Sequence, residues 1–82
     1  MRYFNVTLID DHGSYTATQI LGNSTREAFE YFEAEMMHRL ERPRSSKRPL
    51  VAAFILDTLD NTLLHFIVQG LRAVIVTPKL FE

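Results

Sequence analysis

The sequence predicts an α+β fold, in which an antiparallel β-sheet of four to five strands carries one amphipathic helix on one face, in the order β-β-α-β-β-β. Two observations lead to this prediction. Apolar residues alternate with polar ones in several short segments, and they recur every three to four positions between residues 24 and 42. Turn-forming residues separate these segments. With 82 residues in total, we expect a single domain that spans residues 1–82.

The first two segments, residues 2–10 and 15–21, predict a β-hairpin. The apolar residues that share one face of the first segment are Phe4, Val6 and Leu8. Period-two alternation of aromatic and β-branched residues is typical of a strand. The turn between the segments contains Gly13, which adopts positive φ without strain. Aspartate is favoured in such turns because its carboxylate accepts hydrogen bonds from nearby amides.

The segment that begins at Ser24 predicts the single helix. Ser24 and Glu27 have the spacing of a capping box, in which the serine hydroxyl and the glutamate side chain each bond the other residue's amide. The apolar stripe that should face the sheet is Ala28, Phe29, Phe32, Met36 and Leu40. We expect the helix to end near residues 40–42, because Pro43 disfavours helical geometry at the residue before it.

The C-terminal half predicts two or three further strands. Residues 50–56 are apolar throughout, which is typical of a central strand covered on both faces. Residues 62–71 fit a strand in part and also fit a helical stripe, so a helix stays open there. The preceding pair, Asp60-Asn61, suits a hairpin turn and favours the strand. Residues 72–77 alternate again and predict the last strand.

Both faces of the predicted sheet carry apolar residues. In the third strand, for example, Val51, Ala53 and Ile55 alternate with Ala52, Phe54 and Leu56. A helix of about 17 residues is roughly 25 Å long and can cover most of one face only. We therefore expect a homodimer or another protein partner on the second face, since large apolar patches usually mark such contacts. The alternative is that bulges and side-chain tilt close the sheet on itself.

Charged residues are segregated along the chain, although its net charge is only −1. The acidic residues of the helix include Glu27, Glu30, Glu33 and Glu35, and the basic residues that follow are Arg39, Arg42, Arg44, Lys47 and Arg48. Both groups complement the helix dipole, and glutamates are normal on an exposed helix face. Dipole complementarity acts only within the last helical turn, however, and the basic run extends beyond it.

Residues 42–49 form a predicted flexible basic linker that contains two prolines and two serines. Arginine side chains in such a linker match phosphate groups, and they match acidic protein surfaces equally well. Charged loops also serve solubility alone. The linker contains no aromatic residue, so base stacking is not indicated. The predicted partner-binding residues are Glu27, Glu30, Glu33, Arg42, Arg44, Lys47 and Arg48.

No arrangement of catalytic or cofactor-binding residues is recognisable, so we expect neither an enzyme nor a cofactor or metal. His12 follows two aspartates in a turn, where aspartate has a structural role. Glu35-x-x-His38 has the spacing of a di-iron motif but lacks the second copy that such sites need. His65 lies on a predicted strand. The chain contains no cysteine, which excludes thiolate zinc sites and suits the reducing cytoplasm.

The longest apolar run, residues 50–56, is too short to cross a bilayer as a helix, so we expect no membrane partner. Residues 6–40 resemble the N-terminal half of HicB-type antitoxins in their hairpin and in the helix start Thr25-Arg26-Glu27-Ala28. The order of elements, the size and the lack of cysteine are similar to small phage-encoded anti-CRISPR and other anti-defence proteins. Such proteins block a host complex by stoichiometric binding.

This second resemblance implies a non-enzymatic inhibitor or regulator that binds a host or bacterial protein complex. The alternative is a nucleic-acid-binding or antitoxin-like regulator that uses the basic linker. The protein-binding function would use the acidic helix face, the basic linker or both, whereas the alternative uses the linker to contact phosphates.

Overall fold

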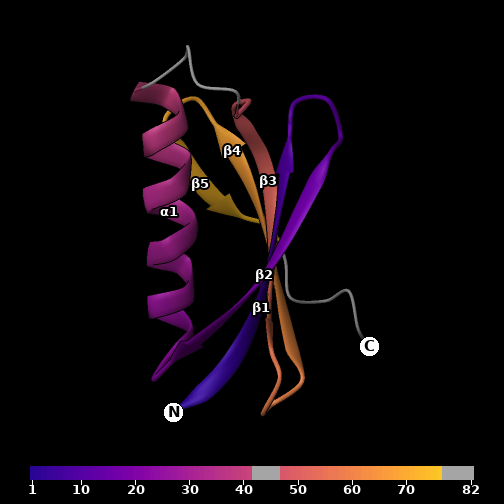
Figure 1. Cartoon of the computed structure of the whole chain (residues 1–82), viewed down its shortest axis with the longest axis vertical. Coiled ribbons are helices and arrows are strands. Elements are labelled where there is room, and N and C mark those ends of the chain that lie inside the picture. Colours follow the sequence, from indigo (N-terminus) through magenta and orange to yellow (C-terminus); the bar gives the residue numbers. More distant parts are fainter. Residues whose placement is uncertain (42–46, 77–82) are drawn as a thin grey trace.

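The computed structural model describes residues 1–41 and 47–76 and confirms the predicted order of elements (Figure 1). The elements are β1 (Arg2–Asp10), β2 (Tyr15–Gly22), α1 (Thr25–Glu41), β3 (Leu50–Asp57), β4 (Thr62–Gln69) and β5 (Arg72–Ile75). The strands form one antiparallel sheet in the spatial order β2-β1-β3-β4-β5. The segment that also fitted a helix is therefore the strand β4, and the last strand ends at Ile75 rather than at residue 77.

The turn between β1 and β2 is held by Asp10, as expected. Its carboxylate accepts hydrogen bonds from the amides of His12, at 2.8 Å, and Ser14, at 3.0 Å. Gly13 lies between these two residues with a φ of 81°, in the left-handed region that favours glycine. The carboxylate thus replaces the backbone partners that these amides lack outside the sheet.

The start of α1 differs in detail from the predicted capping box. The Glu27 carboxylate accepts a hydrogen bond from the amide of Asn23, at 2.9 Å, instead of the amide of Ser24. The Glu27 amide donates to the backbone carbonyl of Ser24, at 3.1 Å, and not to its hydroxyl. The Glu27 side chain therefore caps the amide one residue before the predicted one. The effect is the same, because an amide that precedes the first helical turn gains a hydrogen-bond partner.

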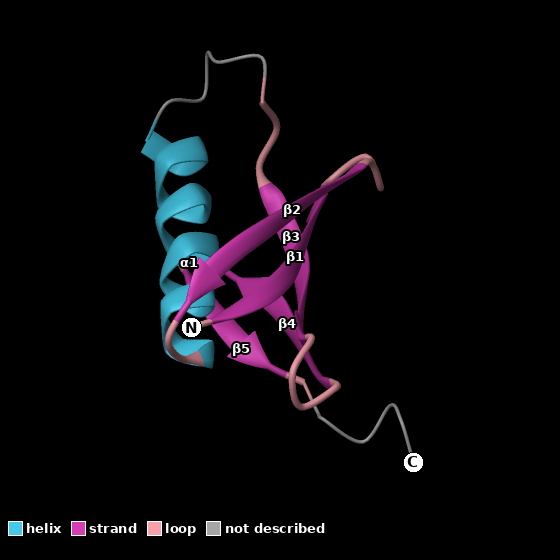
Figure 2. Cartoon of the chain, turned by 60° about the horizontal axis from the view of Figure 1, so that its bottom comes forward, coloured by secondary structure: helices cyan, strands magenta, loops and turns pink. Residues whose placement is uncertain are grey.

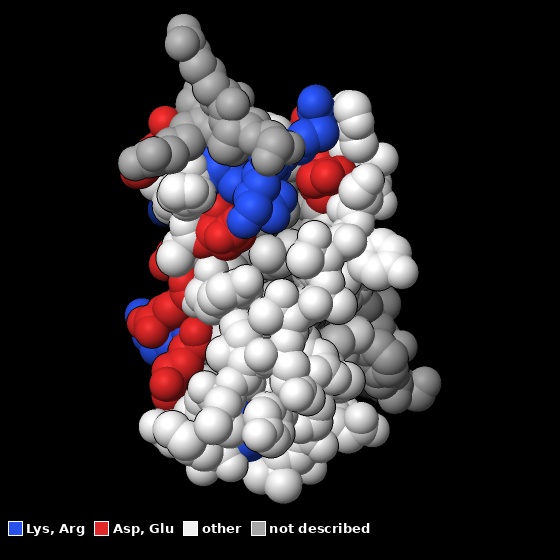
Figure 3. Space-filling model, in the orientation of Figure 1, with Lys and Arg blue, Asp and Glu red and all other residues white. Residues whose placement is uncertain are grey.

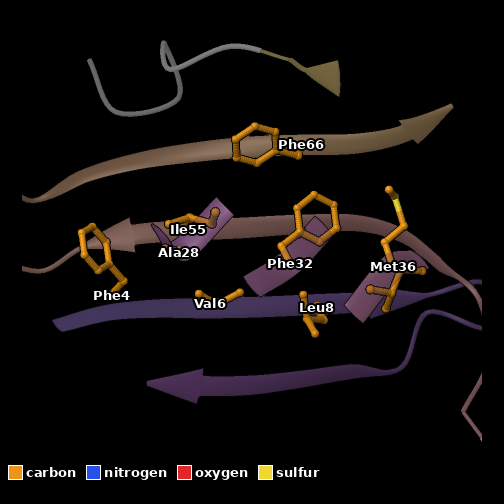
Figure 4. Close-up of a cluster of buried hydrophobic side chains, with 10 residues drawn as sticks. Phe4, Val6, Leu8, Ala28, Phe32, Met36, Ile55 and Phe66 are labelled. Carbon is orange, nitrogen blue, oxygen red and sulfur yellow. The ribbon is translucent and has the colours of Figure 1, made fainter. Parts of the chain in front are cut away.

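The core lies between α1 and one face of the sheet (Figure 4). Its buried apolar members among the described residues are Phe4, Val6, Leu8, Ala28, Phe32, Met36, Leu50, Ala53, Ile55 and Phe66. The three β1 residues are the face that strand alternation predicted, and the three helical residues are spaced by four. Phe29 and Leu40, also in the predicted stripe, are only partly buried at the margin of this core.

One helix does not cover its face of the sheet completely. Figure 2 shows the strands as a single twisted layer with α1 along one side, and α1 packs mainly against β1, β2 and β3. Towards β5 a groove of about 320 Å³ remains, and Ile75 in its wall is 51% exposed. This groove remains because five strands span roughly 24 Å and a helix only roughly 10 Å.

The central strand β3 is covered on one face only, which corrects the prediction made from its unbroken apolar run. Ala53 and Ile55 point towards α1 and are fully buried. Phe54 and Leu56 point to the other face and are half-buried, and Val51 is exposed. None of the described residues forms a second layer over that face (Figure 1). The hydrophobic run indicated a central strand correctly but overstated how much of it the described chain shields.

A buried carboxylate joins the start of β1 to the turn after β3. Asp57 accepts hydrogen bonds from Arg2 Nη1, at 2.8 Å, and from the amides of Leu59 and Asp60. Burial opposes ionisation of Asp57, but these hydrogen bonds and the charge of Arg2 outweigh it, so its pKa lies below the usual value. Asp57 is therefore ionised in the folded state over the physiological pH range.

This lowered pKa predicts acid sensitivity. The unfolded chain takes up a proton at Asp57 at a higher pH than the folded chain, so the contribution of Asp57 to stability is complete above the ordinary pKa of 3.8 and disappears as the pH falls further. Urea unfolding between pH 2.5 and 7 should show Asp57→Asn destabilised at neutral pH and converging with the wild type in acid. Thr58→Val removes the hydroxyl that donates to the Tyr3 carbonyl, so it should be destabilised equally at every pH. Parallel curves for wild type and Asp57→Asn would contradict the assignment.

Candidate partner-binding surfaces

The face of the sheet opposite α1, here called the open face, is almost free of charge. Strand register and alternation place on it Tyr3, Asn5, Thr7, Ile9, Tyr15, Ala17, Gln19, Leu21, Ala52, Phe54, Leu56, Leu63, His65, Ile67, Gln69, Arg72 and Val74. Arg72, the first residue of β5, is the single arginine, lysine, aspartate or glutamate in this described set. Most of the other residues in the set are apolar, and a large apolar patch on a protein surface usually marks a contact with another molecule.

The open face is not flat, because large and small side chains lie side by side on it. Large side chains stand on β3 and β4, where the Phe54 ring stacks on the His65 imidazole with centroids 4.3 Å apart and planes inclined by 10°. In the same row of residues the β1 and β2 side is lower, because Thr7 and Ala17, which pair across the two strands, are small. Between the two sides lies a hollow of about 580 Å³, bounded on the high side by Leu56 and on the low side by Asn5.

The exposed side of α1 carries a second surface, the acidic ridge, which consists of Glu27, Glu30, Glu33 and Glu41. All four residues are exposed. The one cation beside them in the described chain is Arg26, which lies 3.7 Å from Glu30, and both side chains are mostly in solvent. An ion pair between two exposed side chains contributes little to the stability of the fold. The ridge therefore keeps a net negative charge on a rigid element, facing away from the sheet.

The third surface is a cluster of paired charges where α1 approaches β3. Arg39 is buried, with a side chain 9% exposed, and its Nε donates to Glu35 Oε1 at 3.0 Å. Its Nη1 donates to the Arg48 carbonyl at 3.1 Å, and Lys47 Nζ lies 3.4 Å from the same Glu35 oxygen. Arg48 in turn donates twice to the Asp11 carboxylate, at 2.6 and 3.1 Å. Figure 3 shows acidic and basic atoms side by side at this end of the molecule.

These contacts keep both carboxylates of the cluster ionised. Burial opposes the charge of Glu35, but the Arg39 hydrogen bond and the charges of Lys47 and Arg39 outweigh it, so the pKa of Glu35 is lowered. The Arg48 hydrogen bond likewise lowers the pKa of Asp11, against a smaller opposing effect of burial. The cluster is thus a set of satisfied ion pairs that joins the helix, the linker end and the β1–β2 turn.

The predicted site residues fall into three groups. Glu27, Glu30 and Glu33 lie together on the acidic ridge, although the Glu27 carboxylate also caps the helix. Arg42 and Arg44 lie outside the described residues. Lys47 and Arg48 belong to the charged cluster, where each faces a carboxylate of the same chain. Residues 47–49 are therefore anchored, and the amide of Asp11 donates to the Pro49 carbonyl as well, at 3.1 Å.

Arg39 is the residue whose role the sequence did not reveal. Its position in the last turn of the helix indicated dipole complementarity, whereas the structure buries it between Glu35 and the backbone of residue 48. The Glu35–Arg39 spacing of four residues was a local signal for the ion pair. No comparable signal exists for Arg48 and Asp11, which are 37 residues apart.

Metal-binding chemistry has no visible arrangement within residues 1–41 and 47–76. No three histidine, aspartate or glutamate side chains of this part of the chain converge as metal ligands. The carboxylates beside His12 are used otherwise, Asp10 by the turn and Asp11 by Arg48. The described helix is neither long nor apolar enough to traverse a membrane.

A resemblance in element order and size defines no shared site, because unrelated functions occur on the same small folds. The HicB-type and anti-defence resemblances therefore remain predictions. Comparison of the chain with protein-family models, with curated proteins and with solved structures found no match.

Proposed function

We propose that this chain is a cytoplasmic, non-enzymatic binding protein that inhibits or regulates a host or bacterial protein complex by stoichiometric association. The observation that supports this proposal best is the acidic ridge. Four exposed carboxylates lie on one face of a rigid helix, with only Arg26 beside them among the described residues. A surface of this kind attracts and orients a basic protein surface. The small anti-defence proteins that the chain resembles act by stoichiometric binding, often through acidic or basic patches.

The ridge suits association because it is rigid. The opposite side of α1 is anchored in the core by Phe32 and Met36, which are fully buried. Its C-terminal end is tied to the linker by Arg39. A partner therefore meets carboxylates whose backbone is already ordered, and the entropic cost of binding is reduced to that of the side chains.

The basic linker provides the alternative, a nucleic-acid-binding regulator. Of its predicted cationic residues, Lys47 and Arg48 each lie against a carboxylate. Those pairs would have to open, or to share their cation, before either side chain could neutralise a phosphate. The protein partner is therefore the better-supported proposal, and the experiment below distinguishes the two.

The test is affinity capture from a bacterial lysate, with and without nuclease, followed by binding measurements with the captured partner. Glu30→Gln/Glu33→Gln should weaken binding at least about tenfold, because the ridge loses two of its charges. The matched control is His12→Lys/Thr16→Lys, which changes the net charge from −1 to +1 as the glutamine pair does, but away from the ridge. The control should bind like the wild type.

Two outcomes would contradict the proposal. A partner that is lost on nuclease treatment would point to the linker and nucleic acid, and its affinity should then fall steeply with salt. Equal binding by the ridge variant and the wild type would remove the ridge as the functional surface.

A further inference from the structure

The open face has the charge pattern of a surface that meets a copy of itself. A two-fold axis places like residues of the two chains near one another, so charged side chains on such a face repel across the axis. The open face carries one charge, Arg72, at its margin, and its centre is formed by β1, β3 and β4 without any. The carboxylates of the acidic ridge lie on the opposite side of the molecule, pointing away from such an axis.

The size of the open face matches a stable dimer contact. Four strands of eight or nine residues and one of four, spaced about 4.8 Å apart, cover roughly 600 Å² in projection. The accessible area of a surface with side-chain relief exceeds its projection. A specific interface buries about 800 Å² per partner, so the open face alone is close to the required area.

The relief of the open face is self-complementary. High side chains on β3 and β4, including Phe54, Leu56 and Leu63, stand beside the hollow of about 580 Å³. The floor of the hollow on β1 and β2 contains the small residues Thr7 and Ala17. In an isologous contact, a single two-fold rotation relates the two copies. The high side chains of each copy therefore meet the low part of the other, and they fill both hollows.

We propose that two copies of this chain associate face to face through their open faces, with the β3–β4 side chains of each copy seated in the β1–β2 hollow of the other. The two sheets would pack about 10 Å apart with their strands inclined by about 30°, as in β-sandwiches. Both helices then lie on the outside, and each dimer presents two acidic ridges. The inference does not depend on the function proposed for the ridge, because the two surfaces are on opposite sides.

Ala17→Lys tests this arrangement directly. Ala17 is exposed on the open face, so the substitution fills the hollow with a charged chain without removing a core contact. Thr16→Lys is the matched control, since it adds the same charge at the adjacent residue, whose side chain faces the other side of the sheet. Light scattering and sedimentation across the micromolar range should show wild type and Thr16→Lys as dimers. The dissociation constant of Ala17→Lys should rise at least about tenfold.

Cross-linking gives an independent readout, because the chain contains no cysteine. In a mixture of Ala17→Cys and Leu63→Cys, a short bis-maleimide should join the two variants, because the arrangement places β2 of one copy against β4 of the other. A mixture of Thr16→Cys and Leu63→Cys should stay uncoupled, while circular dichroism verifies that the variants are folded. A wild-type chain that is monomeric throughout the micromolar range would overturn the proposal. A dimer that Ala17→Lys does not weaken, or equal cross-linking in both mixtures of cysteine variants, would also overturn it, because another surface would then hold the copies together.

Discussion

Replacement of Phe32 by alanine should destabilise the domain by about 3–5 kcal/mol, the largest effect that we expect from a single substitution. Phe32 is fully buried at the middle of α1, with its ring centroid 6.0 Å from that of Phe29 and 5.8 Å from that of Phe66. Alanine leaves a cavity at the junction of helix and sheet, and the rigid strands around it cannot collapse to fill it. Small domains have total stabilities of about 5–15 kcal/mol, so much of this variant should be unfolded at 37 °C.

Urea unfolding followed by circular dichroism measures this loss, with Leu59→Ala as the matched control. Leu59 is also a large apolar residue, but it is exposed in the turn after β3, so its removal should change the free energy of unfolding by less than about 0.5 kcal/mol. Similar stabilities for Phe32→Ala and Leu59→Ala would show that Phe32 is not at the centre of the core.

Glu35→Ala should lower the free energy of unfolding by about 1–3 kcal/mol. Glu35 accepts from Arg39 Nε at 3.0 Å and lies 3.4 Å from Lys47 Nζ. Without the carboxylate, the buried Arg39 guanidinium keeps its bond to the Arg48 carbonyl but loses its counter-charge. A buried charge without a partner is costly, although the partial exposure of Glu35 keeps the effect below that of a fully buried pair.

The control for this prediction is Glu33→Ala, which removes an exposed glutamate from the same helix and should change stability by less than about 0.5 kcal/mol. The double variant Glu35→Ala/Arg39→Met should lose less stability than the sum of its two single variants, with a coupling of at least about 0.5 kcal/mol. Strict additivity would mean that Glu35 and Arg39 do not act as a pair in solution.

Local patterns were sufficient for the elements of this fold. The alternation of Phe4, Val6 and Leu8 placed β1 and its buried face correctly, because side-chain direction along a strand has period two regardless of what covers it. The spacing by four of Phe32 and Met36 did the same for α1. Turn chemistry at Gly13 was equally local, since positive φ is a property of the residue itself.

Patterns that depend on neighbouring layers were less reliable. The unbroken apolar run of β3 predicted cover on both faces, but only Ala53 and Ile55 are covered by α1. An apolar side chain favours burial wherever it lies in the sequence. Whether it is buried depends on whether another helix or strand packs against it. The same difference explains the groove beside Ile75, which a helix seated over β1–β3 does not reach.

Of the candidate surfaces, one could be predicted from local spacing and another depends on the tertiary structure. The acidic ridge could be read from the sequence, because the residues of one helix face are related by spacing alone. The basic run after the helix was read as a linker for partners, but in the structure Lys47 and Arg48 lie against Glu35 and Asp11. The Arg48–Asp11 contact spans 37 residues and depends on how the chain returns from α1 to β3, which no local pattern contains.

The sequence by itself determined the α+β class, the order of strands and helix along the chain, the core face of β1 and the acidic side of α1. Each of these follows from residue spacing and from the conformational preferences of single residues. Only the tertiary structure decided that β1 lies between β2 and β3, that Arg39 is a buried structural cation, and that one face of the sheet is almost free of charge, mostly apolar and hollowed. These features arise where residues distant in sequence come together, so their physical cause is the packing of the whole chain.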